Sequence, residues 1–523
     1  MHQLALIIGL LLATVIAVGL GDRLKLPYPV IMVLIALGVA FIPGIPHLDL
    51  APELILPLFL PPLLYATAKK TSWSVFRIRW RSVVLLAIAL VVVTTAVVAG
   101  VAWLLIPGIG IPAAIALGAM LAPPDPVAVE SVAGRVRMPR RLMTVMQSEG
   151  LFNDAAAIVI FQTAVAAAVK GSEINGWLAI KFVTGAAIAV ALGFAMAWAA
   201  KKLMHFIASS TARSAVTLIL PFAVYIAAEE VHASGVIAVV VAALEMKRRA
   251  RPHDAAERIT SSSFWDVVEL LATGIAFGLI GLEARDVITE TGTDILPMLG
   301  HAGIICAVVI LVRAAWLSLL IPGNLRRGDG LPPAGTKDVV ILTWCGMRGL
   351  ATLALALALP TVTADGSPFP ARDQIIVTAI AVLFATLVVP GFTLPWLMRR
   401  LKAQESPAAE HEEEMVLAQR AEDAALAALD EAPFLHDLPV QRQEAITRGI
   451  KRLSEDLVID VPVPCDKKGA VKIRHDSTVA IRTIALDAAR QEILLARNEV
   501  GVDPETADRV LRRLDLRTVM LQK

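Results

Sequence analysis

Five polar residues stand out in this chain because each lies inside a long apolar stretch, where charged and amide side chains are costly. They are, in chain order, Asp125, Glu149, Asn153, Asp154 and Arg348. Carboxylate and amide oxygens suit hard cations and protons, whereas a buried guanidinium needs partners that accept its hydrogen bonds. The group therefore predicts a site for a monovalent cation or for protons, with an arginine that stabilises the surrounding structure.

Asp125 lies among Pro123, Pro124 and Pro126 in the apolar stretch 111–133. Each proline removes a backbone donor, so a regular helix is not possible at this point. Broken backbone at membrane depth is tolerated only against protein or beside a water-filled cavity. At 1.5 Å per residue Asp125 lies ~21 Å along the stretch. The alternative is a kinked packing helix whose aspartate pairs with a neighbour.

Asp154 lies in the stretch 142–169, which enters from the opposite side, and is ~18 Å along it. Glu149 and Asn153 are four residues apart and share a helix face, and Asp154 is turned ~100° from Asn153. Two aspartates that enter from opposite sides therefore meet near the middle of a ~30 Å hydrocarbon core. The alternative is a pair of side chains that hydrogen-bond to each other only for packing.

Arg348 is flanked by glycines and lies ~15 Å along its apolar stretch, which predicts a second broken helix. A buried guanidinium must be paired, and the available partners are Glu149 or the ends of the broken helix that carries Asp125. Arg313 is a further intramembrane arginine nearer the predicted cytoplasmic side. For Arg313, a side chain that extends to the membrane surface explains the sequence as well as a functional role does.

The elements that must position these residues are membrane helices. Of the 523 residues, 57% are hydrophobic and 18% are charged, and the mean hydropathy is +0.69. This apolar excess is too large for one buried core, which excludes soluble enzymes, fibres and disordered scaffolds. The net charge of +2 provides no field for nucleic acid. About thirteen stretches reach the length and polarity of a membrane span: 3–21, 28–46, 52–68, 82–106, 111–133, 142–169, 176–200, 212–229, 232–247, 263–283, 296–321, 338–359 and 372–399.

Loop charges predict the orientation of these spans. The loops after odd-numbered stretches hold 25 lysines and arginines, whereas those after even-numbered stretches hold three. Under the positive-inside rule the N-terminus faces outside and the C-terminal tail is cytoplasmic. We therefore predict a multi-pass protein of the cell (inner) membrane, with a transmembrane domain at 1–402. Residues 403–523 form a helical cytoplasmic domain with a regulatory or dimer-supporting role, or alternatively a loosely folded appendage.

The two broken stretches, the fifth and the twelfth, occupy corresponding places in two halves. If stretches 1–6 form one unit, stretches 8–13 form another with its break at the same position, and the odd offset of seven reverses its orientation. Inverted repeats with broken helices that cross at the midplane are typical of secondary transporters. The predicted fold is an all-α polytopic membrane protein of this type.

Three stretches resemble the signature sequences of the monovalent cation:proton antiporter-1 family, namely PPDPVAV, EGLFNDAAAIVIF and GMRGLATLALALALP. The resemblance implies thirteen helices, a dimerisation domain beside a six-helix core, a homodimer and elevator-like alternating access. It implies that Asp154 exchanges the proton and the cation and that Asn153 stabilises it. It further implies that Asp125 is the acidic residue at the broken helix and that Glu149 and Arg348 form a structural ion pair.

The predicted function is exchange of protons for sodium or another monovalent cation, for pH and cation homeostasis, with no cofactor. Asp154 and Asp125 are the predicted cation ligands. The chain departs from the family at Pro124, where a threonine is usual, and at Ala66, where many members have a glutamate. These departures leave open the choice among sodium, potassium and lithium. The resemblance to Asn-Asp rather than Asp-Asp members implies electroneutral one-for-one exchange.

Two other classes of protein fit part of the pattern. Asp125 and Asp154 could form the dyad of an intramembrane aspartyl protease, although such a dyad needs a Gly-Asp motif on a later helix that neither aspartate has. A channel is the third possibility, but it leaves the inverted halves and the paired carboxylates unexplained. Cation-driven proton flux separates an antiporter from a protease, which would cleave peptides.

Overall fold

The structure is a computed structural model that describes most of the chain. The described residues are 2–24, 26–40, 52–70, 84–125, 128–130, 136, 138–171, 176–207, 209–248, 255–291, 295–327, 333–403, 407–432, 435, 439–458, 476–497, 499, 502 and 504–522. Within these ranges the regular elements are helices, and one isolated β-bridge pairs Val362 with Pro368 in the loop between α15 and α16. The predicted all-α fold is therefore confirmed.

The helices of the apolar part follow the predicted stretches closely. They are α1 (His2–Leu24), α2 (Tyr28–Ala40), α3 (Pro52–Lys70), η1 (Val84–Ala89), α5 (Leu90–Leu105), α6 (Ile111–Leu121), α8 (Arg140–Lys170), α9 (Gly176–His205), α10 (Ser210–Glu230), α11 (Gly235–Arg248), α12 (Ala255–Thr291), α13 (Ile295–Arg327), α14 (Thr336–Trp344), α15 (Leu350–Leu357) and α16 (Arg372–Leu401). The polar tail holds α17 (Pro407–Asp430), α18 (Val440–Ile450), α19 (Leu453–Val458), α20 (Asp476–Ala496) and α21 (Pro504–Gln522).

By their contacts the helices divide into two compact units. The larger unit comprises Met1–Phe206, Ala215–Arg248 and Trp265–Gln404, and the smaller comprises Ile207–Ser214, Arg249–Phe264 and Glu405–Lys523. The larger unit holds all the residues singled out for chemistry. The assignment of separate transport and regulatory domains to 1–402 and 403–523 stays a prediction.

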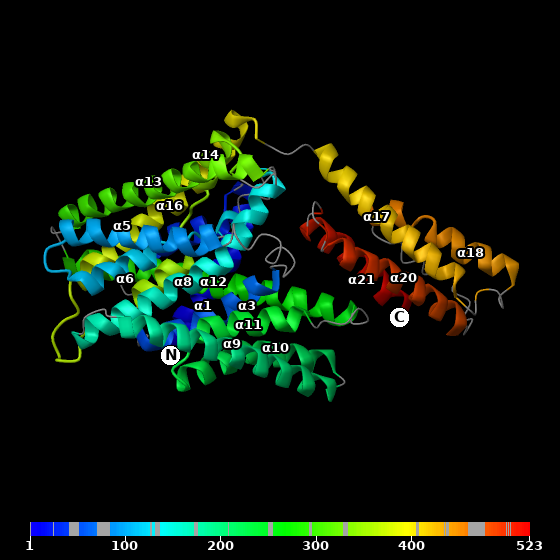
Figure 1. Cartoon of the computed structure of the whole chain (residues 1–523), viewed down its shortest axis with the longest axis horizontal. Helices are drawn as coiled ribbons and strands as arrows, with labels where there is room; N and C mark the ends of the chain where they lie inside the picture. Colours follow the sequence, from blue (N-terminus) through cyan, green and yellow to red (C-terminus); the bar gives the residue numbers. More distant parts are fainter. Residues whose placement is uncertain are drawn as a thin grey trace. The chain divides into compact units, whose positions relative to one another are not determined.

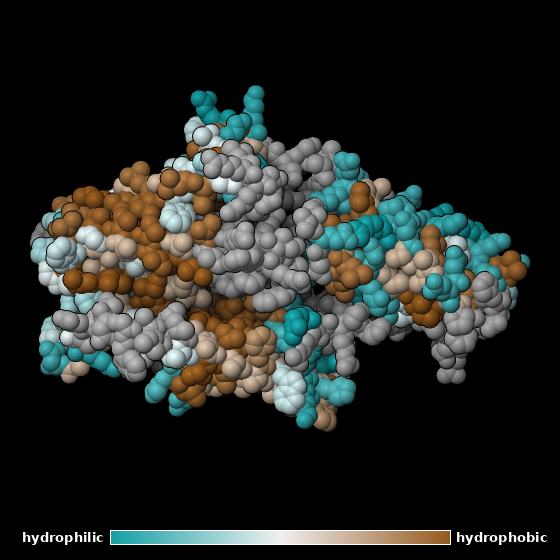
Figure 2. Space-filling view, viewed as in Figure 1, coloured by the Kyte–Doolittle hydropathy of each residue, from teal (hydrophilic) through white to brown (hydrophobic). Residues whose placement is uncertain are grey.

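The larger unit is built from helices that suit a membrane. Seven helices in the described part of the chain are long and apolar enough to cross one, and two shorter apolar helices accompany them. The predicted count of thirteen stays a prediction. Figure 2 shows hydrophobic residues over much of the face of this unit that is in view. Its exposed apolar side chains include Leu104, at 77% exposed, and Leu319, at 75%. Exposed apolar surface of this extent is typical of contact with lipid.

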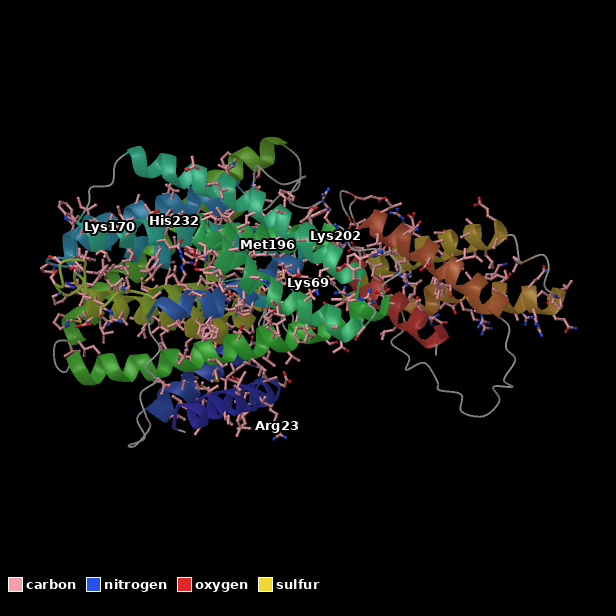
Figure 3. All side chains as sticks on the ribbon, turned by 90° about the horizontal axis from the view of Figure 1, so that it is seen from below. Arg23, Lys69, Lys170, Met196, Lys202 and His232 are labelled. Carbon is pink, nitrogen blue, oxygen red and sulfur yellow. The ribbon has the colours of Figure 1, made fainter. Side chains whose placement is uncertain are left out.

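The labelled side chains of Figure 3 agree with spans that alternate in direction. Lys69 and Lys202, at the ends of α3 and α9, lie toward one end of the helices, whereas Lys170 and His232 lie toward the other. Lys69 and Lys202 follow odd-numbered stretches, and Lys170 and His232 follow even-numbered ones. These two pairs of side chains therefore lie toward different ends of the helices, and the side that faces the cell interior stays a prediction.

Within the larger unit the helices pack into two groups. The first, which we call the core group, joins η1, α5, α6, α8, α13, α14, α15 and α16, and α5 lies beside α13 (Figure 1). The second, the flanking group, holds α1 with α2, and α11 with α3 and α9. In the flanking group α12 packs on α1 and α2, since an added Cβ at Gly278 would lie 2.6 Å from Leu10 and 2.9 Å from Met32. The core group corresponds to the predicted stretches 4–6 and 11–13.

The polar tail has its own core, formed by small and aliphatic side chains of α17, α18, α19, α20 and α21. Arg490 is fully buried there, with its Nε 3.0 Å from Asp515 and an Nη atom donating to Thr518 at 2.8 Å. At the surface, hydrogen bonds from Arg420 hold the pKa of Glu499 below its usual value. α21 begins at Pro504, since a proline at the first helical position has no donor to lose.

Candidate functional site

The two predicted helix breaks are present and lie against each other. α6 ends at Leu121 and gives way to irregular backbone up to Asp125, and α14 and α15 are separated by a break at 345–349. The Asp125 backbone N–H donates to the Met347 carbonyl at 2.7 Å, so the two broken segments cross. Each break exposes helix ends whose backbone groups need partners inside the protein. The side chains at the crossing supply those partners.

Arg348 complements the C-terminal end of α6. Its Nε donates to the Leu121 carbonyl at 2.7 Å and one Nη donates to the Gly346 carbonyl at 2.8 Å. Thr352 donates to the neighbouring Met120 carbonyl at 2.8 Å. The end of a helix carries a partial negative charge, so a cation at this position is favourable. Arg348 therefore joins the two broken segments and neutralises the end of α6.

Asp125 complements the N-terminal end of α15. Its Oδ2 accepts a hydrogen bond from the Leu350 backbone N–H at 3.1 Å, and its Oδ1 accepts one from Ala128 at 3.4 Å. The start of a helix carries a partial positive charge, which stabilises a carboxylate. The crossing thus pairs each helix end with the opposite charge. Asp125 is held by backbone donors and is stabilised in its charged form.

Asn153 and Asp154 present open oxygens beside this crossing. The Asn153 amide donates to the Pro124 carbonyl at 3.3 Å, which ties α8 to the broken segment. Oδ1 of Asn153 and Oδ1 of Asp154 are buried, and neither has a hydrogen-bond partner among the described residues. Asp154 lies within electrostatic reach of Asp125. Buried acceptors without donors are costly unless a ligand satisfies them, so this pair of oxygens fits a proton or a cation.

The predicted ion pair between Glu149 and Arg348 is wrong. Glu149 pairs instead with Arg313, through two hydrogen bonds of 2.7 and 3.0 Å, and both side chains are almost fully buried. Arg313 also donates to the Leu342 carbonyl at 2.9 Å. The reason is geometric, since Arg348 lies within the break and finds free carbonyls at the end of α6. In the described part of the chain Arg348 makes no ion pair.

Breaking the Glu149–Arg313 pair should destabilise the fold. A single partner left behind is an uncompensated buried charge, which costs about 3–5 kcal/mol. We expect Glu149→Ala and Arg313→Ala each to lower the melting temperature in detergent, and the double variant to lose less than the two losses added. The control is Glu444→Ala, which removes an exposed ion pair with Arg448 and should leave melting unchanged. Wild-type melting of both single variants would refute the assignment.

Sequence reasoning missed several contributors to the crossing. Thr352 and Thr386, whose hydroxyl accepts from the Arg348 backbone N–H at 3.2 Å, carry no sequence signal beyond a polar residue in an apolar helix. The sequence marked Arg313 as an arginine within an apolar stretch, but only the structure shows that its side chain points to Glu149. Ala66 of α3 is buried and supplies no side-chain ligand, in line with its noted departure from the family pattern.

This fold and site define a class. A helical membrane protein with two crossed broken helices, and with buried carboxylate and amide oxygens at the crossing, has the architecture of a secondary transporter. Residues 9–400 match the family described as "Sodium/hydrogen exchanger, transmembrane". The chain belongs to this sodium/hydrogen exchanger family of transporters, which confirms the resemblance read from the motifs. The protease alternative finds no support in these matches.

Individual relatives agree with this assignment. A sodium, potassium, lithium and rubidium/H+ antiporter of Bacillus pumilus is 32% identical over 77% of the chain, which spans 62% of that relative. A protein of Mycobacterium tuberculosis described as an uncharacterized Na+/H+ exchanger is 30% identical over 99% of the chain and 96% of its own length. The solved sodium proton antiporter MjNhaP1 of Methanocaldococcus jannaschii has a TM-score of 0.60 at 20% identity. That match covers 76% of this chain and 99% of MjNhaP1, and shows a shared fold.

Proposed function

We propose that this protein exchanges protons for sodium across the cell membrane and that Asp154 is the exchanging carboxylate. The observation that carries the proposal is the pair of buried, unpartnered oxygens on Asp154 and Asn153, beside the crossing of two broken helices. Relatives described as antiporters of sodium, or of sodium, potassium, lithium and rubidium, support a monovalent cation as substrate. Sodium is the substrate that these descriptions share.

The chemistry is competition for one carboxylate. An Asp154 oxygen that holds a proton presents no negative charge to a cation, and a bound cation excludes the proton. Asn153 contributes its neutral Oδ1 as a second ligand and uses its amide N–H to hold the Pro124 carbonyl. Asp125 adds negative charge from a fixed place, since its two oxygens accept backbone hydrogen bonds. In this scheme Asp125 attracts the cation and Asp154 exchanges it.

Access to the site must alternate between the two sides of the membrane. We infer that the core group, which carries every site residue, moves against the flanking group. The proposed orientation has the N-terminus outside and the tail in the cytoplasm, on the basis of the 25 basic residues in the odd-numbered loops. The large exposed apolar faces fit a lipid membrane and a homodimer contact.

Flux in reconstituted vesicles tests this function. The purified protein is reconstituted into proteoliposomes that contain a pH-sensitive dye. These vesicles should release protons when sodium is added outside, and vesicles without protein should not. Potassium and lithium in the same assay establish the range of cations. A protein that is folded, inserted and inactive with every alkali cation would refute antiport, and peptide cleavage would revive the protease alternative.

We expect this exchange to be independent of membrane voltage. Asn153 cannot titrate, and Asp125 stays charged at the α15 N-terminus, so one proton leaves for each monovalent cation that binds. If exchange moved net charge across the membrane, the potential would change its free energy by about 2.3 kcal/mol per elementary charge per 100 mV. A potassium-diffusion potential imposed with valinomycin, with sodium as the exchanged cation, should leave the rate unchanged. A several-fold change of rate with voltage would mean that a second proton travels, most simply on Asp125.

A further inference from the structure

The helix α9 of the flanking group packs on α11 along one face and leaves another face exposed. Gly193 marks the packed face, since an added Cβ there would lie 2.6 Å from the Ala238 carbonyl of α11. Residues four apart lie on one side of a helix. The exposed face carries such a row, which we call the α9 stripe: Val190, Phe194, Trp198, Lys202 and Phe206.

The side chains of α9 change from apolar to basic at one level. Residues 184–200 carry no charged side chain, and Lys201, Lys202 and His205 follow directly. At 1.5 Å per residue the uncharged part spans ~26 Å, close to the ~30 Å of a hydrocarbon core. Tryptophan and lysine at such a boundary lie at the level of the lipid headgroups. The basic end of the α9 stripe therefore lies where a phospholipid presents its phosphate.

α11 runs parallel to α9, so both helices end at a similar level. An added Cβ at Gly185 would lie 3.5 Å from the His232 carbonyl, and one at Gly193 would lie 2.6 Å from the Ala238 carbonyl. α9 reaches Lys202 nine residues after Gly193, and α11 ends ten residues after Ala238. Under the proposed orientation both ends face the cytoplasm.

Lys202 carries a positive charge that no carboxylate in the described part of the chain neutralises. Arg248, the last residue of α11, donates instead to the buried Glu245 at 2.6 and 2.8 Å. The Lys202 Nζ lies 5.4 Å from the centroid of the Trp198 ring, whose face attracts a cation. Trp198 is 54% exposed, and Phe206, one turn beyond Lys202, is 76% exposed. The stripe thus presents a cation between two exposed aromatic side chains.

We propose that the α9 stripe binds an anionic phospholipid of the cytoplasmic leaflet. Lys202 would contact the phosphate, and Phe194 and Val190 would lie along an acyl chain. The charges are complementary, and an anionic lipid has no choline cation that competes with Lys202 for its phosphate. This inference goes beyond the proposed function, because it gives the flanking group a lipid ligand and leaves exchange to the core group. A lysine in the last turn of a helix also neutralises the helix end, and the test separates the two roles.

Two lipids that differ only in their headgroups test the proposal. The full-length protein in detergent is titrated with phosphatidylglycerol or phosphatidylcholine of the same acyl chains, and melting and retained lipid, by native mass spectrometry, are measured. We expect phosphatidylglycerol to stabilise the wild type more. Lys202→Gln should raise its half-saturating concentration on the order of fivefold, which corresponds to ~1 kcal/mol for one cationic side chain at a membrane surface.

Two further variants serve as controls. Lys202→Arg keeps the charge and the contact with the Trp198 ring, so it should bind phosphatidylglycerol as the wild type does. Lys170→Gln removes an exposed lysine from the last turn of α8, toward the other end of the helices (Figure 3). It should leave the binding of both lipids unchanged.

The possible outcomes separate a lipid site from other roles of Lys202. Unchanged phosphatidylglycerol binding by Lys202→Gln overturns the proposal. A loss of melting temperature that is equal with both lipids also overturns it, because Lys202 would then act on the end of α9 alone. A dimeric wild type and a monomeric Lys202→Gln, with lipid binding unchanged, would assign the stripe to a second copy of the chain.

Two points keep the result decisive. If Lys202→Gln does not fold, Trp198→Leu removes the ring beside the cation and should raise the half-saturating concentration of phosphatidylglycerol in the same titration; wild-type binding by that variant overturns the proposal. Lipid binding is measured without sodium, so its failure leaves the proposed exchange intact. A wild type that selects phosphatidylglycerol but exchanges no cation supports the lipid site and refutes the proposed function alone.

Discussion

Replacing Asp154 by asparagine should abolish sodium-driven proton release while the protein still folds and inserts. Asparagine keeps the size of the side chain, so the packing of α8 is preserved, but it holds neither a titratable proton nor a negative charge. The loss should be complete to the level of empty vesicles, because no other described carboxylate at the crossing has an open oxygen. The measurement is dye dequenching in proteoliposomes together with melting in detergent.

The control for this variant is Asp365→Asn, the same change in an exposed loop. Asp365 accepts hydrogen bonds from Thr363 and Ser367, which hold its pKa at about 2, outside the membrane helices. Asp365→Asn should leave the exchange rate unchanged. Full exchange by Asp154→Asn would transfer the exchanging role to Asp125, whereas early melting would show that the charge of Asp154 is needed for the fold.

The sequence predicted the helix breaks correctly because their causes are local. Pro123, Pro124 and Pro126 remove three backbone donors within four residues, and Gly346 and Gly349 weaken the helix around Arg348. Local causes also set the ends of α8, which spans Arg140–Lys170 where the apolar pattern predicted 142–169. Spacing alone placed Asn153 and Asp154 at the depth of Asp125, and the hydrogen bond to Pro124 confirms that α8 reaches the broken segment.

The arginine that pairs with Glu149 could not be predicted from local sequence. Arg313 and Arg348 both lie within apolar stretches, and the sequence does not say which of them reaches Glu149. That depends on the rotation of α13 and α14 about their axes, which is fixed by long-range packing. The C-terminal end of α6 has free carbonyls that accept hydrogen bonds from Arg348, and Glu149 pairs with Arg313 instead. Thr352 and Thr386 could not be singled out for a different reason, since threonine is common in membrane helices.

At Gly349 the crossing has no room for a side chain. It immediately precedes α15, and an added Cβ would lie 1.7 Å from Oδ2 and 2.4 Å from Cγ of Asp125. Real Cβ atoms do not approach other heavy atoms this closely. The carboxylate cannot easily retreat, because Leu350 and Ala128 both donate to it. The absence of a side chain at Gly349 therefore permits Asp125 to reach the N-terminus of α15.

Gly349→Ala should consequently disable exchange and weaken the fold. Overpacking costs typically about 1–3 kcal/mol, and a loss of about 1.4 kcal/mol at the site already slows a step tenfold. We expect exchange to fall at least tenfold and melting to fall with it, because Asp125 loses its backbone donors and α15 loses its N-terminal anion. Gly303→Ala is the matched control, since an added Cβ there meets nothing within 4 Å, and it should behave as wild type. Wild-type exchange by Gly349→Ala would mean that Asp125 does not occupy this place in the working protein, and both its fixed charge and the one-for-one stoichiometry would then lose their basis.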